Sequence, residues 1–141
     1  MSDLHKIFKL IEDCTGVKLD DTQCDIWDDL GCVGDDFTDL IDSYADMFKI
    51  DMSNYLWYFH NDEEGLFNIG SLFFKAPYQR VERIPVTPQM LADFIPKGKW
   101  DMSYPPHVIP AKRYDLKINL FIMLIFAFIL FVILYIKYFN S

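Results

Sequence analysis

The chain contains little cysteine and histidine, and neither is spaced for metal or disulfide chemistry. It has 141 residues, of which three are cysteines and three are histidines. An odd number of cysteines without a C-x-x-C spacing argues against a disulfide framework and against a zinc site, and fits a reducing compartment. We therefore expect packed thiols and surface imidazoles at these positions, which are Cys14, Cys24, Cys32, His5, His60 and His107.

Catalytic motifs are also missing. There is no glycine-rich phosphate loop and no G-x-S-x-G sequence. The carboxylate pairs Asp20-Asp21, Asp28-Asp29 and Asp35-Asp36 lack the D-x-D-x-D-G spacing of a calcium loop. General acid–base catalysis needs a carboxyl group in a cleft that raises its pKa, and these pairs are expected to face solvent. We predict no enzymatic activity, no catalytic residue, no cofactor and no dedicated metal site.

Basic residues are scarce in the first half of the chain. Residues 1–64 hold 17 Asp and Glu against 4 Lys and Arg, a net charge of −13, whereas residues 65–141 hold 4 against 9, a net charge of +5. The acidic part would repel nucleic acid and attract a basic protein surface. We expect a basic patch of a protein partner and no nucleic-acid partner.

The stretch from Ile118 to Ile136 has Asn119 as its one strongly polar residue, and fifteen of its nineteen residues are Leu, Ile, Phe or Val. As a helix it would be roughly 28 Å long at about 1.5 Å per residue, close to the hydrocarbon thickness of a bilayer. Those fifteen residues favour insertion by about 5–9 kcal/mol. We predict a transmembrane helix over residues 117–137, preceded by a proline-containing linker over 101–116 and followed by a short tail, 138–141.

Charges beside this segment predict its orientation. Lys112, Arg113 and Lys117 precede it, offset by Asp115, and Lys137 alone follows it. Basic residues concentrate on the cytoplasmic side of membrane helices. We expect a single-pass protein of the bacterial inner membrane, in contact with the lipid bilayer through residues 117–137 and with its N-terminal domain in the cytoplasm.

Apolar periodicity predicts four helices before this anchor. Apolar residues from Leu4 to Cys14 give the first helix, which Gly16 ends, and a long loop over 17–34 follows. A second helix starts at Asp35, and Ser53 is expected to cap a short third helix over Asn54 to Phe59. Residues 66–84 form an irregular excursion with some strand character. Thr87-Pro88 then opens a last helix that includes Met90, Leu91, Phe94 and Ile95 and ends at Pro96 and Gly98.

This organisation resembles an acyl carrier protein. The resemblance rests on Asp29-Leu30-Gly31 before the second helix and on Asp46-Met47-Phe48-Lys49-Ile50-Asp51 at its end. Carrier proteins have a serine at the start of this helix that receives the phosphopantetheine arm. Counting back from Phe48 with the carrier spacing puts Gly34 at that position. Glycine has no hydroxyl, so the resemblance implies a carrier-like module without the arm.

The chain is similar, more closely, to a bacterial family of unknown function with a carrier-like fold. The matching motifs span about residues 4–100 and are Gly34-Asp35-Asp36, Phe48-Lys49-Ile50-Asp51, Tyr58-Phe59 with Glu63-Glu64, Thr87 to Ile95, and Gly98-Lys99-Trp100. His60-Asn61-Asp62 departs from the Pro-Glu-like turn that is usual there. The similarity implies a mainly all-α, four-helix domain over residues 1–100 with a long loop between helices 1 and 2, and it supplies no catalytic residue.

Two surfaces are candidates for partner binding. The second helix carries an acidic stripe, which is either a docking surface or an ordinary solvated face. Like charges three or four residues apart cost a few tenths of a kcal/mol per pair, which favours docking. The stripe consists of Asp35, Asp36, Asp39, Asp42 and Asp46. Aromatic residues form the second candidate, as core or as interface, and they are Tyr55, Trp57, Tyr58, Phe59, Phe67, Phe73 and Phe74.

These features predict a non-enzymatic, membrane-anchored, acyl-carrier-like adaptor or regulator that presents the acidic helix to a protein partner. One alternative is an immunity or inhibitor protein that neutralises a toxin, for which a small acidic domain on a membrane tether would also serve. A second alternative is an atypical acyl carrier in membrane lipid or envelope synthesis. Its arm would then be attached at Thr38 or Ser43, the nearest hydroxyl groups after Gly34.

Overall fold

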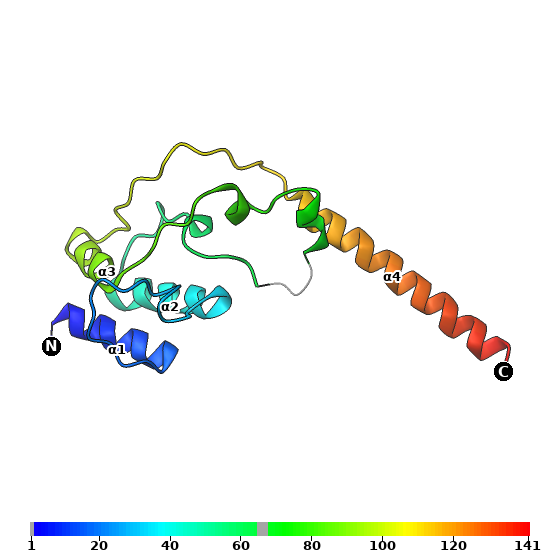
Figure 1. Cartoon of the computed structure of the whole chain (residues 1–141), viewed down its shortest axis with the longest axis horizontal. Helices are drawn as coiled ribbons and strands as arrows, with labels where there is room; N and C mark the ends of the chain where they lie inside the picture. Colours follow the sequence, from blue (N-terminus) through cyan, green and yellow to red (C-terminus); the bar gives the residue numbers. More distant parts are fainter. Residues whose placement is uncertain (1, 65–67) are drawn as a thin grey trace. The chain divides into compact units, whose positions relative to one another are not determined.

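A computed structural model describes residues 2–64 and 68–141, and the chain divides into two compact units. Unit 1 comprises Met1–Glu64 with Val81–His107, and unit 2 comprises Gly65–Arg80 with Val108–Ser141. The described residues are mostly helical and contain no strand, only an isolated bridge between Asp51 and Lys99 (Figure 1). The predicted predominance of helix is therefore confirmed.

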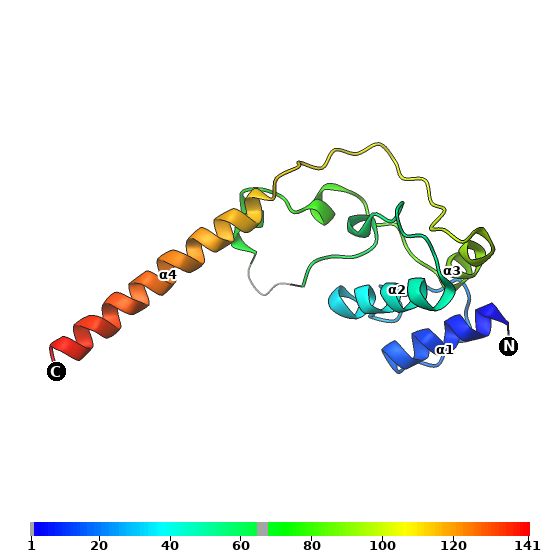
Figure 2. The ribbon, with the colours of Figure 1, turned by 180° about the vertical axis from the view of Figure 1, so that it is seen from behind.

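Unit 1 is built on three α-helices, α1 (Asp3–Thr15), α2 (Gly34–Phe48) and α3 (Pro88–Phe94). Helix α1 packs against both α2 and α3, and α1 and α2 run in roughly opposite directions (Figures 1 and 2). Their ends follow the sequence signals. Gly16 caps α1 with a left-handed φ of 72°, and Thr87 accepts the Met90 backbone N–H at the start of α3. The helices predicted at these three places, and the loop before α2, are confirmed.

The core of unit 1 comes from the apolar sides of these helices and from the loops between them. Each buried Leu, Ile or Phe contributes about 1.5–3 kcal/mol relative to leaving it exposed. Tyr44 of α2 also donates a hydrogen bond from its hydroxyl to the Leu91 carbonyl of α3 at 2.7 Å. The largest fully buried side chains here are Trp100, Tyr44, Phe37, Phe59, Ile7, Ile11, Ile26, Leu40, Ile41 and Leu91.

The predicted third helix is wrong. Only Trp57–Phe59 forms a short 3-10 turn, η1, and it begins after Leu56 rather than after Ser53. The chain just before it is held by neighbours distant in sequence. Asp51 donates its backbone N–H to the Gly98 carbonyl and accepts the Trp100 N–H, each at 2.9 Å. A six-residue helix has too few internal hydrogen bonds to compete with such long-range pairing.

The described residues of unit 2 form two 3-10 turns and one long helix: η2 (Ile69–Leu72), η3 (Pro77–Arg80) and α4 (Tyr114–Phe139). The strand character predicted for residues 66–84 is wrong for the described part, 68–84. Asn68 favours a turn because its Oδ1 accepts the Ser71 backbone N–H at 3.0 Å, and Pro77 cannot donate to a strand ladder. η2 packs against α4.

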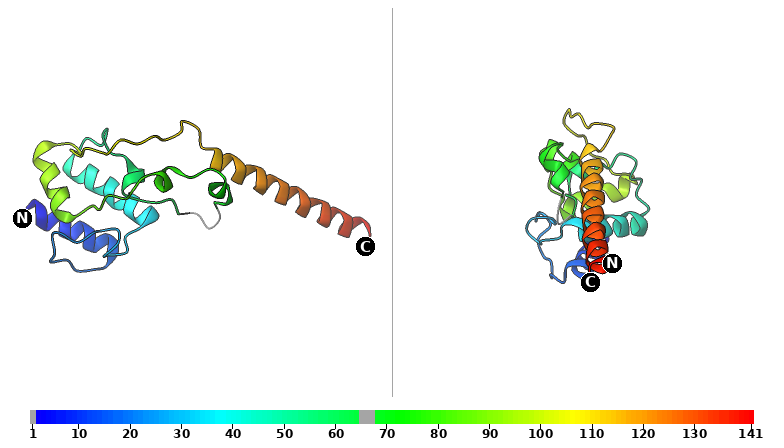
Figure 3. Two further views of the ribbon diagram at one scale, coloured as in Figure 1. Left: turned by 45° about the horizontal axis from the view of Figure 1, so that its top comes forward. Right: turned by 90° about the vertical axis from the view of Figure 1, so that its right-hand side faces the viewer.

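Helix α4 is the one helix in the described residues that is long and apolar enough to cross a membrane. Its apolar window is not buried against other parts of the chain. It runs without interruption from orange to red in Figure 3. The sequence prediction of an apolar helix is confirmed, and the helix begins at Tyr114, three residues before the predicted span.

Candidate functional site: the acidic face of α2 and its Gly34 end

One face of α2 is lined by carboxylates. All five aspartates of the predicted stripe are exposed, while Phe37, Leu40, Ile41 and Tyr44 on the opposite face are buried. In residues 2–64 and 68–141, no Lys, Arg or His side chain forms a salt bridge with any of the five. The helix therefore presents uncompensated negative charge to its surroundings. These residues are Asp35, Asp36, Asp39, Asp42 and Asp46.

The negative field of this face reaches the end of α1. Partial burial, followed by the charges of Asp13, Asp39 and Asp36, raises the pKa of the Cys14 thiol. A raised pKa keeps this exposed cysteine in the thiol form, which is a poor nucleophile and a poor metal ligand. No group of three or more His, Cys, Asp or Glu side chains in the described part of the chain is placed to hold a metal ion.

The N-terminal end of α2 has an unusual backbone. Gly34, the first residue of the helix, is buried and has a φ of +58°, in the left-handed region. Asn61 binds both backbone groups of this glycine: its Oδ1 accepts the Gly34 N–H at 2.9 Å, and its Nδ2 donates to the Gly34 carbonyl at 2.8 Å. The residue before the helix makes no side-chain N-cap hydrogen bond. Instead, the Asn61 side chain pairs with the N–H and the carbonyl of Gly34, as the backbone of a neighbouring residue would.

Three further residues close around Gly34. Trp27 donates from Nε1 to Asn61 Oδ1 at 3.1 Å, and the Thr38 hydroxyl lies between the Gly34 carbonyl and Asn61 Nδ2, each at 3.2 Å. The side chain of Glu64 lies directly over the Gly34 Cα, so that a Cβ at this position would collide with it. The backbone of Gly34 is therefore surrounded by side chains of its own chain.

A buried hydrogen-bond network supports the segment that carries Asn61. The neighbouring His60 donates from Nδ1 to the Ile84 carbonyl at 2.9 Å, and its Nε2 accepts the Tyr104 hydroxyl proton at 3.0 Å. The Tyr104 oxygen in turn accepts Trp100 Nε1–H at 2.9 Å. A carbonyl only accepts, so Nδ1 of the imidazole carries a proton. Burial lowers the pKa of His60 to about 4, which agrees with a neutral ring at neutral pH.

Two expectations for the cysteines and histidines need correction. His60 was expected at the surface but is fully buried, because its two ring nitrogens both have partners inside unit 1. Cys14 was expected to be packed but is exposed at the end of α1, whereas Cys24 and Cys32 are buried. Burial is also the main reason that the pKa of Cys32 rises to about 11.

The aromatic residues that were predicted as one cluster are divided between the two units. Phe59 is fully buried in unit 1, and Tyr55 stacks on His60 with ring centroids 5.5 Å apart. Phe73 and Phe74 belong to unit 2 and are exposed. Phe67 lies outside the described residues. The aromatics of unit 1 thus serve mainly its interior, and those of unit 2 lie on its surface.

The exposure of the stripe agrees with the apolar period of the second helix. Asn61 was missed as the residue that holds Gly34. The signal for it was the departure at His60-Asn61-Asp62, where three polar residues follow an aromatic run. Tyr104, from the predicted linker over 101–116, was missed as well. Comparison of the chain with protein-family models, with curated proteins and with solved structures finds no match.

Proposed function

We propose that the protein is a non-enzymatic, membrane-anchored adaptor or regulator whose unit 1 is acyl-carrier-like but has no phosphopantetheine arm. In this proposal α4 spans the bacterial inner membrane once, unit 1 lies in the cytoplasm, and α2 presents its acidic face to a basic patch of a protein partner. The observation that carries the proposal is the row of five exposed aspartates, none of which forms a salt bridge in the described residues.

The charge arrangement supports docking over simple solubility. Carboxylates spaced three or four residues apart on one helix, such as Asp35 with Asp39 and Asp39 with Asp42, repel one another by a few tenths of a kcal/mol per pair. A partner with Lys or Arg opposite them would relieve this repulsion and speed association by electrostatic steering. A solubilising surface has no such requirement, because it works as well with charges of both signs interspersed.

The Gly34 end of α2 supports the absence of an arm. A residue with a side chain at this position would need a left-handed φ and would meet Glu64. The Thr38 hydroxyl, one alternative attachment point, is already bonded to Gly34 and Asn61. Co-expression with a phosphopantetheinyl transferase, followed by intact-mass measurement, should leave the mass unchanged. A gain of one arm mass would instead support the atypical carrier.

Co-purification tests the docking face. Asp39→Lys with Asp42→Lys should abolish capture of the partner from detergent-solubilised membranes. The thermal unfolding midpoint should stay within about 2 °C, because both residues are exposed and form no salt bridge with the part of the chain that the structure describes. The matched control, Asp20→Lys with Asp28→Lys, makes the same charge change at exposed positions of the loop before α2 and should retain the partner. Equal capture by both variants would reject the α2 face as the contact. Capture of a toxin would support the immunity-protein alternative.

A further inference from the structure

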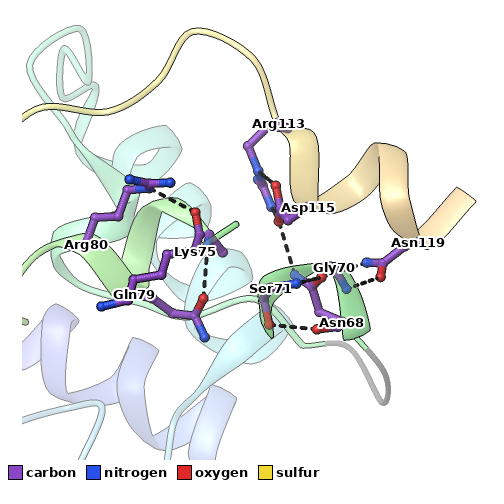
Figure 4. A network of polar contacts seen from close by, with 10 residues as sticks. Asn68, Gly70, Ser71, Lys75, Gln79, Arg80, Arg113, Asp115 and Asn119 are labelled. Atoms are coloured by element: carbon purple, nitrogen blue, oxygen red, sulfur yellow. Dashed lines mark hydrogen bonds and ion pairs between the residues drawn. The ribbon is translucent and has the colours of Figure 1, made fainter. Parts of the chain in front are cut away.

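Unit 2 satisfies the one strongly polar side chain in the apolar part of α4. Asn119 accepts the Gly70 backbone N–H on Oδ1 at 2.8 Å and donates from Nδ2 to Asn68 Oδ1 at 2.7 Å (Figure 4). At Gly70 the turn lies so close to α4 that any Cβ would collide with the Asp115 carbonyl. Turn η2 is thus fixed against the first two turns of α4, and Asn119 is explained as part of that junction.

Asp115 closes the same junction nearer the start of α4. Its side chain is buried and accepts bonds from Arg113 Nε at 2.9 Å, from an Arg113 terminal nitrogen at 2.6 Å and from Asn68 Nδ2 at 3.1 Å. Asn119 is one turn further along, about 6 Å, and opens the apolar stretch. In a bilayer spanned by α4, η2 would therefore lie where the lipid headgroups meet the acyl chains.

Three consecutive apolar side chains beside this junction are exposed. Leu72 is 81% exposed, Phe73 70% and Phe74 45%. Leaving a Leu or Phe side chain in water forgoes about 1.5–3 kcal/mol of burial free energy. Contiguous exposed apolar residues usually mark an interaction site, and these lie at the depth at which acyl chains would cover them.

A cationic cavity of about 240 Å³ adjoins the same residues. Phe74 forms part of its apolar wall, and its charged residues are Lys75, Arg80, Lys112, Arg113 and Asp115. Four cations against one carboxylate give it a net charge of +3. Asp115 already engages Arg113, whereas no salt bridge within the described residues involves Lys75, Arg80 or Lys112.

We propose that unit 2 binds an anionic phospholipid, with the headgroup phosphate in this cavity and Leu72 and Phe73 inserted among the acyl chains. The cavity supplies the cations that recognise a phosphate, and Phe74 in its wall is followed back along the chain by the exposed Phe73 and Leu72. A zwitterionic lipid carries its own cation, which a cavity of charge +3 disfavours. An acidic peptide would match the cavity but would leave Leu72 and Phe73 uncovered. This proposal rests on the proposed membrane insertion of α4.

Lipid retention by the full-length chain tests the proposal. The chain is reconstituted in nanodiscs of equal phosphatidylglycerol and phosphatidylcholine, extracted into detergent and analysed by native mass spectrometry. We expect one phosphatidylglycerol to be retained in preference to phosphatidylcholine and not to be displaced by inorganic phosphate. Lys75→Gln with Lys112→Gln should weaken phosphatidylglycerol binding by on the order of 25-fold, since each cation near a lipid surface contributes about fivefold.

Lys9→Gln with Lys18→Gln is the matched control, because it removes two exposed lysines of unit 1. It should bind phosphatidylglycerol like the native chain. Insertion is followed with an environment-sensitive fluorophore at Leu72→Cys in a Cys14→Ser background, with Val17→Cys as the reference. We expect quenching by lipid-borne quenchers at position 72 and by aqueous quenchers at position 17.

Three results would overturn the lipid site. The first is equal retention of the two lipids, and the second is equal loss in the pocket variant and the control. The third is displacement of phosphatidylglycerol by inorganic phosphate or an acidic peptide together with a water-exposed label at position 72. A chain that fails to enter nanodiscs at all would contradict the anchor itself, whereas one that enters but does not select phosphatidylglycerol would contradict this site alone.

Discussion

Units 1 and 2 use the same local device but have opposite exteriors. In each unit an asparagine side chain binds the backbone of a buried glycine: Asn61 holds Gly34 at the start of α2, and Asn119 holds Gly70 beside α4. Unit 1, however, has 20 Asp and Glu against 7 Lys and Arg, a net charge of −13, and unit 2 has 1 against 6, a net charge of +5. The asparagine–glycine hydrogen bonds fix the local backbone in each unit. The charge on the surface of each unit determines which surroundings it favours.

The difference extends to the apolar residues. Unit 1 places its largest aromatic and aliphatic side chains in its interior and leaves carboxylates outside, as a protein in water requires. Unit 2 exposes Leu72 and Phe73 together with the apolar length of α4. We infer that unit 1 is adapted to water and to a basic partner, and unit 2 to the membrane and its anionic lipids.

The largest expected effect comes from removing α4. A chain that ends after Leu116 loses the whole apolar stretch, which favours insertion by about 5–9 kcal/mol. It should move completely from the membrane pellet to the soluble fraction after an alkaline carbonate wash, whereas the full chain should stay in the pellet. A truncated chain that still resisted the wash would break the assignment of membrane binding to α4.

The two asparagines provide the next comparison. Asn61→Ala would leave the Gly34 backbone groups and Trp27 Nε1 without their partner and should lower the unfolding free energy of unit 1 by about 4 kcal/mol. Asn119→Ala should leave it unchanged. Denaturant unfolding of the full chain in detergent, followed by tryptophan fluorescence, reports unit 1 alone, because Trp27, Trp57 and Trp100 all lie there. An equal loss of unfolding free energy in the two variants would contradict the claim that the two asparagines act independently of each other.

Acid should weaken unit 1 through His60. The unfolded state has an imidazole pKa of about 6.5 and the folded state about 4, so the unfolded state binds more protons between these values. The contribution of the neutral His60 to the free energy of unfolding is therefore fully present above pH 6.5. It is lost as the pH falls toward 4, and the loss reaches up to about 3 kcal/mol. His60→Gln should show a flatter dependence between pH 4.5 and 6.5 in the same fluorescence assay. An unchanged slope would exclude His60 as the titrating group.

A smaller effect is expected at Gly34. Gly34→Ser and Gly34→Ala should each cost about 1–2 kcal/mol, because both place a Cβ on a residue with a left-handed φ. The two variants differ only by the serine hydroxyl, so an equal loss of unfolding free energy would assign the cost to the backbone conformation. Glu64→Ala combined with Gly34→Ser should recover little, since the Glu64 side chain is exposed and free to move aside. Full recovery would instead identify the collision with Glu64 as the main constraint.

Apolar periodicity and capping residues were enough to predict α1, α2 and α3, and the continuous apolar run from Ile118 to Ile136 was enough to predict α4. Each depends on contacts within a few residues, such as Thr87 with Met90. The turns of unit 2 could not be predicted in the same way, because Asn68 acquires its partners on α4, 47 and 51 residues later. Local propensity cannot represent such pairing, and the apolar run at Leu72 therefore suggested a strand.

In the candidate site, too, the features that depend on nearby residues could be predicted, and those that depend on distant residues could not. Exposure of the acidic stripe follows from the period of α2, since its aspartates alternate with Phe37, Leu40 and Tyr44 on the buried side. The residue that holds Gly34 could not be found in this way, because Asn61 is 27 positions away from it. His60 and Tyr104 are likewise 44 residues apart. The departure at His60-Asn61-Asp62, directly after the aromatic run, was the sequence feature that pointed to this network.

Photo-crosslinking from α2 in intact membranes is the most direct test of the division of roles between the two units. A photoreactive residue is placed at the exposed Ser43, within the acidic face, and at the exposed Lys9 of α1 as a control. We predict a discrete protein adduct from position 43 that disappears with Asp39→Lys and Asp42→Lys, and none from position 9. No adduct from position 43, or one that persists after this charge reversal, would contradict a docking role for the acidic helix.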